Sequence, residues 1–100
     1  MARPAIPVTF PNVIPDDVIE FGSGKALVPS DAEGEGEVPE GYIGIGVVAK
    51  TVGDIVCDSA TEKKRNFNVR AWRYQTMAIR KIYDTDTDVE GWLYMKKYTY

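Results

Sequence analysis

Histidine is absent from this 100-residue chain, and cysteine occurs once, as Cys57. The lack of histidine removes the commonest general base and the most frequent transition-metal ligand. One cysteine excludes an intramolecular disulfide and a cysteine-rich zinc site, and its place in an apolar stretch predicts a buried, unreactive thiol. We therefore expect a protein that is not an enzyme and that uses no cofactor and no metal.

Long apolar runs are also lacking. No run approaches the ~20 residues that cross a bilayer, and the first seven residues contain no continuous apolar signal region. We expect a soluble chain with no membrane partner. One hundred residues are enough for a single domain with a modest core.

Charge is divided unevenly along the chain. Residues 1–58 carry ten acids and three bases, a net charge of −7, whereas residues 59–100 carry five acids and nine bases, a net charge of +4. A split of this kind can orient a molecule against a charged neighbour.

Prolines crowd the start of the chain, at positions 4, 7, 11 and 15. Each fixes its own φ and pushes the preceding residue toward an extended conformation, which excludes a helix. We expect residues 1–15 to form an extended arm and residues 16–100 a single β-rich domain. The arm either joins its own sheet as an edge strand or lies across a neighbouring subunit. In the second case its contact residues are Arg3, Ile6, Val8, Phe10, Val13 and Ile14.

The stretch Tyr42–Cys57 is rich in β-branched residues and is predicted to form two paired strands. Alternation places the apolar residues 43, 45, 47 and 49 on one side, and Gly44 and Gly46 together on the other. Two short strands are expected at 16–21 and 25–28, separated by a glycine turn. Residues 30–41 are acidic and poor in apolar side chains, so we expect a solvated loop.

The second half also favours strands. Residues 66–74 alternate, with Phe67, Val69 and Ala71 on one side and Trp72 on the other, polar side. Residues 71–83 fit both the period of a strand and the period of a helix. We expect a strand there, with one short helix as the alternative. Residues 91–100 read as a closing strand whose one face carries Trp92, Tyr94, Tyr98 and Tyr100. The fold class is mainly β: a small antiparallel sheet, barrel or sandwich with an extended N-terminal arm.

Two patterns bear on binding. Residues 63–81 hold seven bases and no acid, interleaved with aromatics, which is typical of a platform for single-stranded nucleic acid. That reading selects Arg70, Trp72, Arg73 and Tyr74, but a pI near 4.9 argues against it. The aspartates at 84, 86 and 88 imitate the start of a calcium loop, yet Val89 stands where the glycine is required.

A resemblance extends over about the first sixty residues. The arm, the sequence Lys25-Ala26-Leu27-Val28-Pro29, the acidic loop and the sequence Ile43-Gly44-Ile45-Gly46-Val47-Val48-Ala49 resemble the layout of small tailed-bacteriophage head decoration (auxiliary capsid) proteins. The resemblance implies a β-rich virion protein on the outside of a capsid that cements neighbouring capsomers. It makes residues 3–14 the contact element, and the aromatic, basic C-terminal strands have no counterpart in it.

We therefore expect a structural assembly protein of a virion, present in the host cytoplasm during assembly, with the major capsid protein as partner and with self-association as a further possibility. Apolar, proline-stiffened arms and aromatic strand surfaces suit protein interfaces independently of the resemblance. The first alternative is a small β-barrel that binds single-stranded nucleic acid through residues 63–81. The second is a small acidic regulator or inhibitor of a host protein that acts through the loop 30–41.

Overall fold

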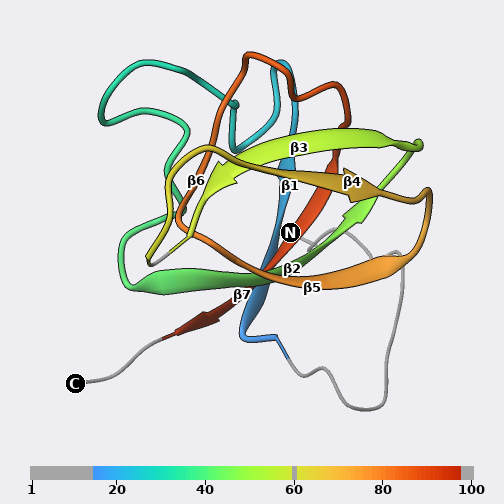
Figure 1. Ribbon diagram of the computed structural model, residues 1–100. Coiled ribbons are helices and arrows are strands. Elements are labelled where there is room, and N and C mark those ends of the chain that lie inside the picture. Colours follow the sequence, from blue (N-terminus) through green and yellow to red (C-terminus); the bar gives the residue numbers. More distant parts are fainter. Residues whose placement is uncertain (1–14, 60, 98–100) are drawn as a thin grey trace.

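The computed structural model describes residues 15–59 and 61–97, and the fold of this part is all-β, with no helix (Figure 1). The chain forms two antiparallel sheets, one of four strands and one of three. The strands are β1 (Asp17–Phe21), β2 (Tyr42–Ala49), β3 (Gly53–Asp58), β4 (Arg65–Val69), β5 (Tyr74–Ile79), β6 (Lys81–Ile82) and β7 (Gly91–Lys97). The predicted fold class is therefore confirmed.

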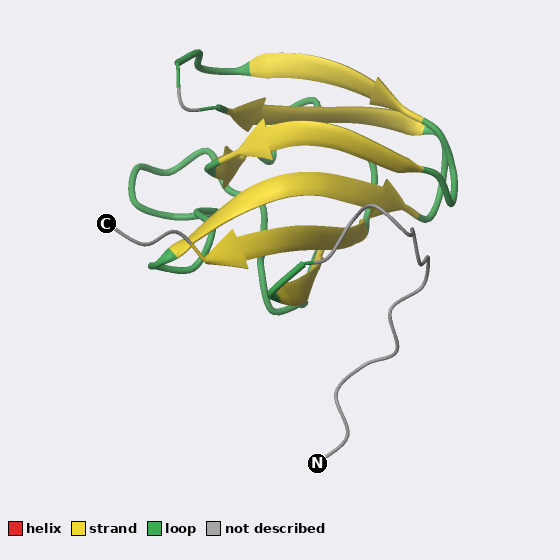
Figure 2. Ribbon diagram, turned by 90° about the horizontal axis from the view of Figure 1, so that it is seen from below, coloured by secondary structure: helices red, strands yellow, loops and turns green. Residues whose placement is uncertain are grey.

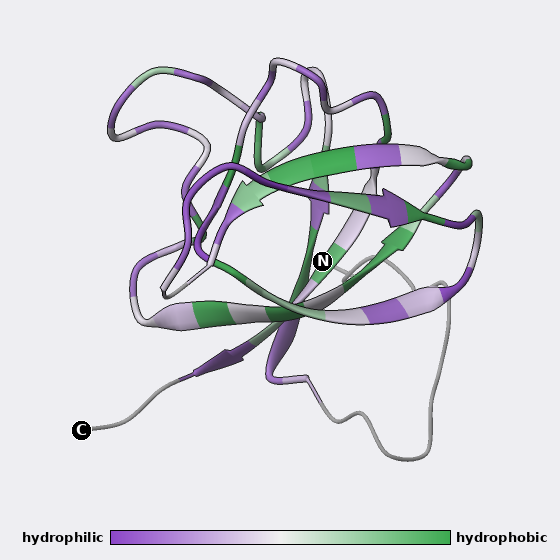
Figure 3. Ribbon diagram, in the orientation of Figure 1, coloured by the Kyte–Doolittle hydropathy of each residue, from purple (hydrophilic) through white to green (hydrophobic). Residues whose placement is uncertain are grey.

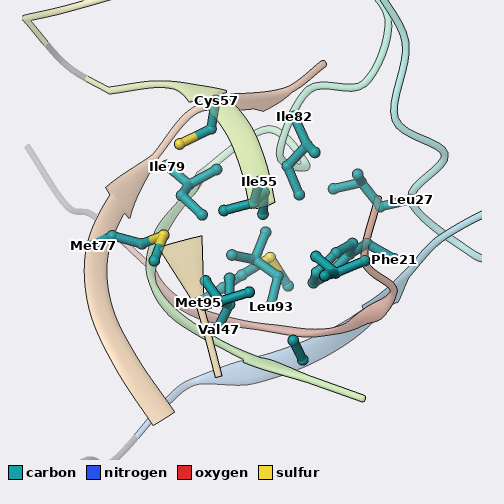
Figure 4. Close-up of a cluster of buried hydrophobic side chains, with 13 residues drawn as sticks. Phe21, Leu27, Val47, Ile55, Cys57, Met77, Ile79, Ile82, Leu93 and Met95 are labelled. Atoms are coloured by element: carbon teal, nitrogen blue, oxygen red, sulfur yellow. The ribbon is translucent and has the colours of Figure 1, made fainter. Parts of the chain in front are cut away.

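The four-stranded sheet has the order β1-β7-β2-β5, and the three-stranded sheet has the order β4-β3-β6. The two sheets lie in separate layers, with β3 and β4 above β2 and β5 in Figure 1, and Figure 2 shows the strands from below. The chain passes directly from one sheet to the other at Arg80, which separates β5 from β6. The core lies between the layers and takes side chains from both (Figure 4).

The core consists mainly of aliphatic side chains at alternate strand positions. Ile55 and Cys57 project into it from β3, and Leu93 and Met95 from β7, all of them 0–2% exposed. Each fully buried side chain of this size stabilises the fold by roughly 1.5–3 kcal/mol. Cys57 is 0% exposed, so its predicted burial is confirmed, and this burial raises the pKa of the thiol to about 11. Figure 3 shows these apolar segments within the strands and hydrophilic residues along the loops.

The prediction that Tyr42–Cys57 forms one hairpin is wrong. Both segments are strands, but β2 lies between β7 and β5, whereas β3 lies between β4 and β6. Because both edges of β2 are already occupied, β3 has no free edge there to pair with. The connection at residues 50–52 instead carries the chain from one layer to the other.

The predicted glycine face is also wrong, because β2 contains a bulge. The register with β7 pairs Gly44 with Met95 but Gly46 with Tyr94, which leaves Ile45 as an extra residue. The extra residue reverses the alternation. A Cβ on Gly44 would meet Leu93 in the core, whereas one on Gly46 would meet the ring of Tyr74 on the outer face of the sheet.

Three further predictions concern which residues form strands. Residues 25–28 form no strand; Leu27 makes only an isolated bridge to Phe21. The strand predicted at 66–74 ends at Val69, because the chain turns at residues 70–73. Phe67 and Val69 do face the core as expected. The strand expected within 71–83 is confirmed as β5 and β6, and the helical alternative is wrong.

The acidic segment 30–41 is a loop, as predicted, but it is tied to β6. The amide of Ser30 donates to the Ile82 carbonyl (3.1 Å), the Ile82 amide donates to the Gly36 carbonyl (2.9 Å), and the Val38 amide donates to the Arg80 carbonyl (2.9 Å). These bonds cover the edge of the three-stranded sheet, where an exposed edge would otherwise invite pairing with another chain.

Candidate functional site

The outer face of the four-stranded sheet carries an aromatic cluster. We use this name for Val48, Trp72, Tyr74, Trp92 and Tyr94. The Trp72 and Trp92 rings lie 5.6 Å apart at 38°, and the Tyr74 and Tyr94 rings pack edge to face at 5.2 Å. Both separations lie in the range that aromatic pairs prefer. Val48 and Tyr94 are 0% and 1% exposed, yet neither belongs to the core between the sheets.

The register explains how these side chains meet. Val48 lies opposite Trp92 on β7 and opposite Tyr74 on β5, so the three side chains share the outer face. Tyr94 lies opposite Gly46, and the absence of a side chain there leaves room for the Tyr74 ring. The Tyr74 hydroxyl donates to the carbonyl of Ile45, the extra residue of the bulge, at 3.2 Å. The bulge thus shapes the cluster as well as the strand.

Trp72 has an unusual backbone conformation. Its φ is +58°, in the left-handed region that bulky residues rarely adopt. Its amide donates to the carbonyl of Ala49 at 2.7 Å, which fixes the turn at residues 70–73 against β2. A residue held in this region costs on the order of 1–3 kcal/mol. The side chain remains 51% exposed, so the strain places an indole at the surface.

Charged groups border the cluster on the β1 side. The Lys50 ammonium lies 5.0 Å from the centre of the Trp92 ring and 3.1 Å from the Glu20 carboxylate, and Lys25 lies 3.7 Å from the same carboxylate. The hydrogen bond from Lys50 is the main cause that lowers the pKa of Glu20 below its ordinary value of 4.5. The Glu20 carboxylate lies opposite Trp92 in the register of β1 and β7 and completes this charged border.

The predicted nucleic-acid residues are brought together only in part. Trp72 and Tyr74 belong to the aromatic cluster, and Arg70 and Arg73 are exposed on the same turn. The sequence had placed Arg70, Trp72 and Tyr74 on one strand face, which the turn at 70–73 excludes. The other bases of the stretch lie elsewhere: Lys81 is buried and donates to the Ala32 carbonyl at 2.6 Å.

Sequence reasoning missed Trp92, Lys50 and Glu20 as members of this site. The alternation of Trp92 and Tyr94 along the closing strand did identify an aromatic face. The alternation could not show that Trp72 packs beside Trp92, because Trp72 lies twenty residues earlier in the chain. The arm residues Arg3, Ile6, Val8, Phe10, Val13 and Ile14 lie outside the residues that the structure describes.

The aspartates of the 84–88 turn are occupied with backbone contacts or are exposed. The Asp88 carboxylate accepts from the Asp54 amide at 2.7 Å. Among residues 15–59 and 61–97, no group of three or more metal-ligating side chains could hold an ion. No helix long and apolar enough to cross a membrane occurs in this part of the chain.

Comparison with protein-family models, curated proteins and solved structures finds no match to this chain. The outer aromatic cluster therefore has to be interpreted from its own geometry. It offers the half-exposed Trp72 ring, a turn that fixes this residue, and charges of both signs at its border.

Proposed function

We propose that this protein is a non-enzymatic assembly component that contacts neighbouring protein subunits through the aromatic cluster. The observation that carries the proposal is Trp72, an indole that is 51% exposed on a residue with left-handed backbone. A fold gains little from straining its backbone to expose a large apolar ring. Tryptophan is, in contrast, among the residues that most often dominate binding energy at protein interfaces.

The resemblance to tailed-bacteriophage head decoration proteins supports a more specific form of the proposal. In that form the protein belongs to a virion, the partner is the major capsid protein, and residues 3–14 form a second contact. The all-β fold agrees with the resemblance. The sequence of the arm supports a contact role because its prolines reduce the conformational entropy that is lost on binding.

The test is co-sedimentation with particles assembled from the major capsid protein of the same source. Replacing Trp72 with asparagine, which tolerates a positive φ, should weaken binding at least about tenfold, as expected for an interface anchor. Val28 is also exposed (49%) and lies away from the cluster, on the chain before the acidic loop. Val28→Ser is therefore the matched control and should bind as the wild type does. Equal binding by both variants would exclude the cluster as the contact.

The arm is tested in the same assay. Replacing Ile6, Val8 and Phe10 with serine removes most of its apolar surface and leaves its prolines unchanged. We expect loss of binding to particles with an unchanged far-ultraviolet circular dichroism spectrum. Binding at wild-type strength would remove the arm from the proposal.

Binding of single-stranded nucleic acid is the second candidate, because the exposed Arg70 and Arg73 flank the exposed indole of Trp72. Cations beside a stacking ring are the arrangement that such ligands use. This candidate predicts salt-sensitive retention on a single-stranded DNA column, lost in the double variant Arg70→Gln/Arg73→Gln. Failure of the wild-type chain to bind at low salt would eliminate it.

A further inference from the structure

The two edges of the three-stranded sheet differ. The edge formed by β6 is covered by backbone hydrogen bonds from the loop at residues 30–41. The edge formed by β4 pairs, within the part of the chain that the structure describes, on one side only, with β3 (Figure 1). An uncovered edge presents backbone donors and acceptors that can pair with another chain.

The hydrogen bonds of β3 show which backbone groups of β4 point to the open side. The Val56 carbonyl accepts from the Tyr83 amide at 2.8 Å, and the Asp54 carbonyl accepts from the Asp88 amide at 3.0 Å, both on the side of β3 away from β4. Backbone groups alternate in direction along a strand, so the intervening residue, Ile55, directs its groups to β4. There it lies opposite Phe67.

Asn66 and Asn68 flank Phe67, so their N–H and C=O groups point to the open side. At one end of this edge the Gln75 side chain takes the place of a strand: its amide donates to the Asn68 carbonyl (3.4 Å) and accepts from the Arg70 amide (3.1 Å). A residue of a paired strand bonds the carbonyl and the amide two residues on in the same way. Among residues 15–59 and 61–97, no hydrogen bond covers the Asn66 backbone on this side.

The open edge is strongly basic. Residues 63–73 contain five bases and no acid, and all five bases are exposed: Lys63, Lys64, Arg65, Arg70 and Arg73. In the described part of the chain, the ion pair that involves any of them joins Arg65 to Glu62 at 3.1 Å. Two such edges repel each other, which opposes pairing of β4 with β4 of a second copy. An acidic segment is attracted by the same charges.

A cavity of about 320 Å³ lies beside the edge, on the outer face of the three-stranded sheet. It is lined by Lys64 and Asn66, by Val56 and Tyr83, and by the acids Asp31 and Asp86. Strand addition gains specificity from pockets that take alternate side chains of the added strand. Because acids already line this cavity, an apolar side chain packed against the valine and the tyrosine ring suits it better than a carboxylate.

We propose that the open edge of β4 binds an extended acidic segment of a partner protein by strand addition. The backbone of the segment pairs with Asn66 and Asn68, its carboxylates lie near the five bases, and one apolar side chain enters the cavity. The inference goes beyond the proposed function, because neither the aromatic cluster nor residues 1–15 take part in it.

The other occupants are less well suited to this edge. The acidic loop of a second copy is already bonded to β6, through the amides of Ser30 (3.1 Å) and Val38 (2.9 Å). Single-stranded nucleic acid matches the bases but has no ladder of peptide groups to pair with the Asn66 backbone. The net charge of −3 also opposes binding of a long polyanion.

The first experiment measures amide hydrogen exchange of the full chain by NMR, with a short acetylated peptide of alternating glutamate and valine as the probe. The amides of Asn66 and Asn68 should exchange quickly in the free chain and become protected when the peptide is added. The Arg70 amide, already bonded to Gln75, should not change. Absence of protection at Asn66 and Asn68 at low salt would overturn the proposal.

Two N-methylated versions of the peptide separate strand addition from simple attraction of charge. One is methylated at its odd-numbered amides and the other at its even-numbered amides, and both keep every carboxylate. Alternate amides of a strand face the same neighbour, so one version should bind and the other should not. Equal binding by both would overturn the proposal. A peptide with lysine in place of glutamate is the matched control for charge and should not bind.

A variant of the chain tests the edge itself. Asn66→Pro removes the outward N–H and leaves the ladder to β3 intact, because proline is tolerated on an edge strand where the missing N–H faces solvent. It should lose peptide binding, whereas Asn66→Thr, which keeps the amide, should bind as the wild type does. Wild-type binding by Asn66→Pro would contradict strand addition. Circular dichroism checks that both variants fold, and the methylated peptides decide the question on the wild-type chain if Asn66→Pro does not.

Other results would assign the edge to a different occupant and so overturn the proposal. A wild-type mass that rises with concentration in analytical ultracentrifugation, but not in Asn66→Pro, would indicate a second copy. Retention on single-stranded DNA without peptide binding would indicate nucleic acid. Trp72→Asn should bind the peptide as the wild type does, so failure of this inference and failure of the proposed function are distinguishable.

Discussion

The two apolar regions of this molecule, the core between the sheets and the aromatic cluster outside them, are equally buried at their centres. Ile55 and Leu93 are 0% exposed in the core, and Val48 and Tyr94 are 0% and 1% exposed in the cluster. The core is mainly aliphatic and is enclosed by two sheets. The cluster is mainly aromatic, lies on one sheet, and ends in the half-exposed Trp72. The central residues are therefore buried to the same extent in both regions, and the cluster differs from the core by the exposed Trp72 and its left-handed backbone.

The comparison predicts that core truncation has the largest effect on stability. Leu93→Ala removes a fully buried side chain that both sheets enclose, and it should lower the free energy of unfolding by about 3 kcal/mol because a cavity remains. Urea denaturation monitored by circular dichroism measures this. A loss below about 1 kcal/mol, the size expected of a surface substitution, would mean that the core is less enclosed than the structure indicates.

The second prediction concerns glycine substitutions on the two faces of β2. A Cβ at Gly46 would overlap the Tyr74 ring, and one at Gly44 would lie 2.9 Å from the Leu93 side chain in the core. Both Gly→Ala changes should destabilise by about 2 kcal/mol through overpacking. Only Gly46→Ala should alter the near-ultraviolet circular dichroism of the aromatic rings. Equal spectral changes in both variants would contradict the division that the bulge creates.

The third, smaller effect concerns the loop that covers β6. Asp31 accepts from the amides of Asp84 (3.1 Å) and Thr85 (3.0 Å) and from the Thr85 hydroxyl. The Thr85 hydroxyl bond is the main cause that lowers the pKa of Asp31 below its ordinary value of 3.8. Because the pKa of Asp31 is lower in the folded state, the ionised carboxylate stabilises the fold at pH values above its unfolded-state pKa. This contribution is lost as the pH falls through the folded-state pKa.

Asp31→Asn should therefore lower the melting temperature at pH 7, and the difference from wild type should shrink as the pH falls below about 3.8. Thermal denaturation at a series of pH values measures this. Glu33 is exposed in the same loop, so Glu33→Gln is the matched control for the loss of one charge. A wild-type advantage that stays constant down to pH 2 would show that the charge of Asp31 is not involved.

The smallest effect on stability is expected at Trp72. Trp72→Asn relieves left-handed strain, because asparagine tolerates a positive φ, and it loses ring contacts of about 0.5–1.5 kcal/mol. The two terms oppose each other, so the free energy of unfolding should stay within about 1 kcal/mol of wild type. A loss of 3 kcal/mol or more would mark Trp72 as a structural residue and would weaken the comparison drawn above.

The sequence by itself determined most of the strand segments and much of the core, although residues 25–28 form no strand. Alternation identified Phe67 and Val69 as inward-facing, and the place of Cys57 in an apolar run indicated its burial. These properties follow from the two-residue period of a strand, which a local pattern reveals. The acidic loop was recognised in the same way, because a segment with few apolar side chains has nothing to bury.

Only the tertiary structure decided which strands pair and where the aromatic cluster forms. β2 and β3 are neighbours in sequence but lie in different sheets, because pairing depends on which edges remain open after distant strands have assembled. The bulge at Ile45 reversed the alternation, since one extra residue moves every later side chain to the other face. Trp72 and Trp92 meet because a turn and a sheet bring them together, and no local pattern contains that information.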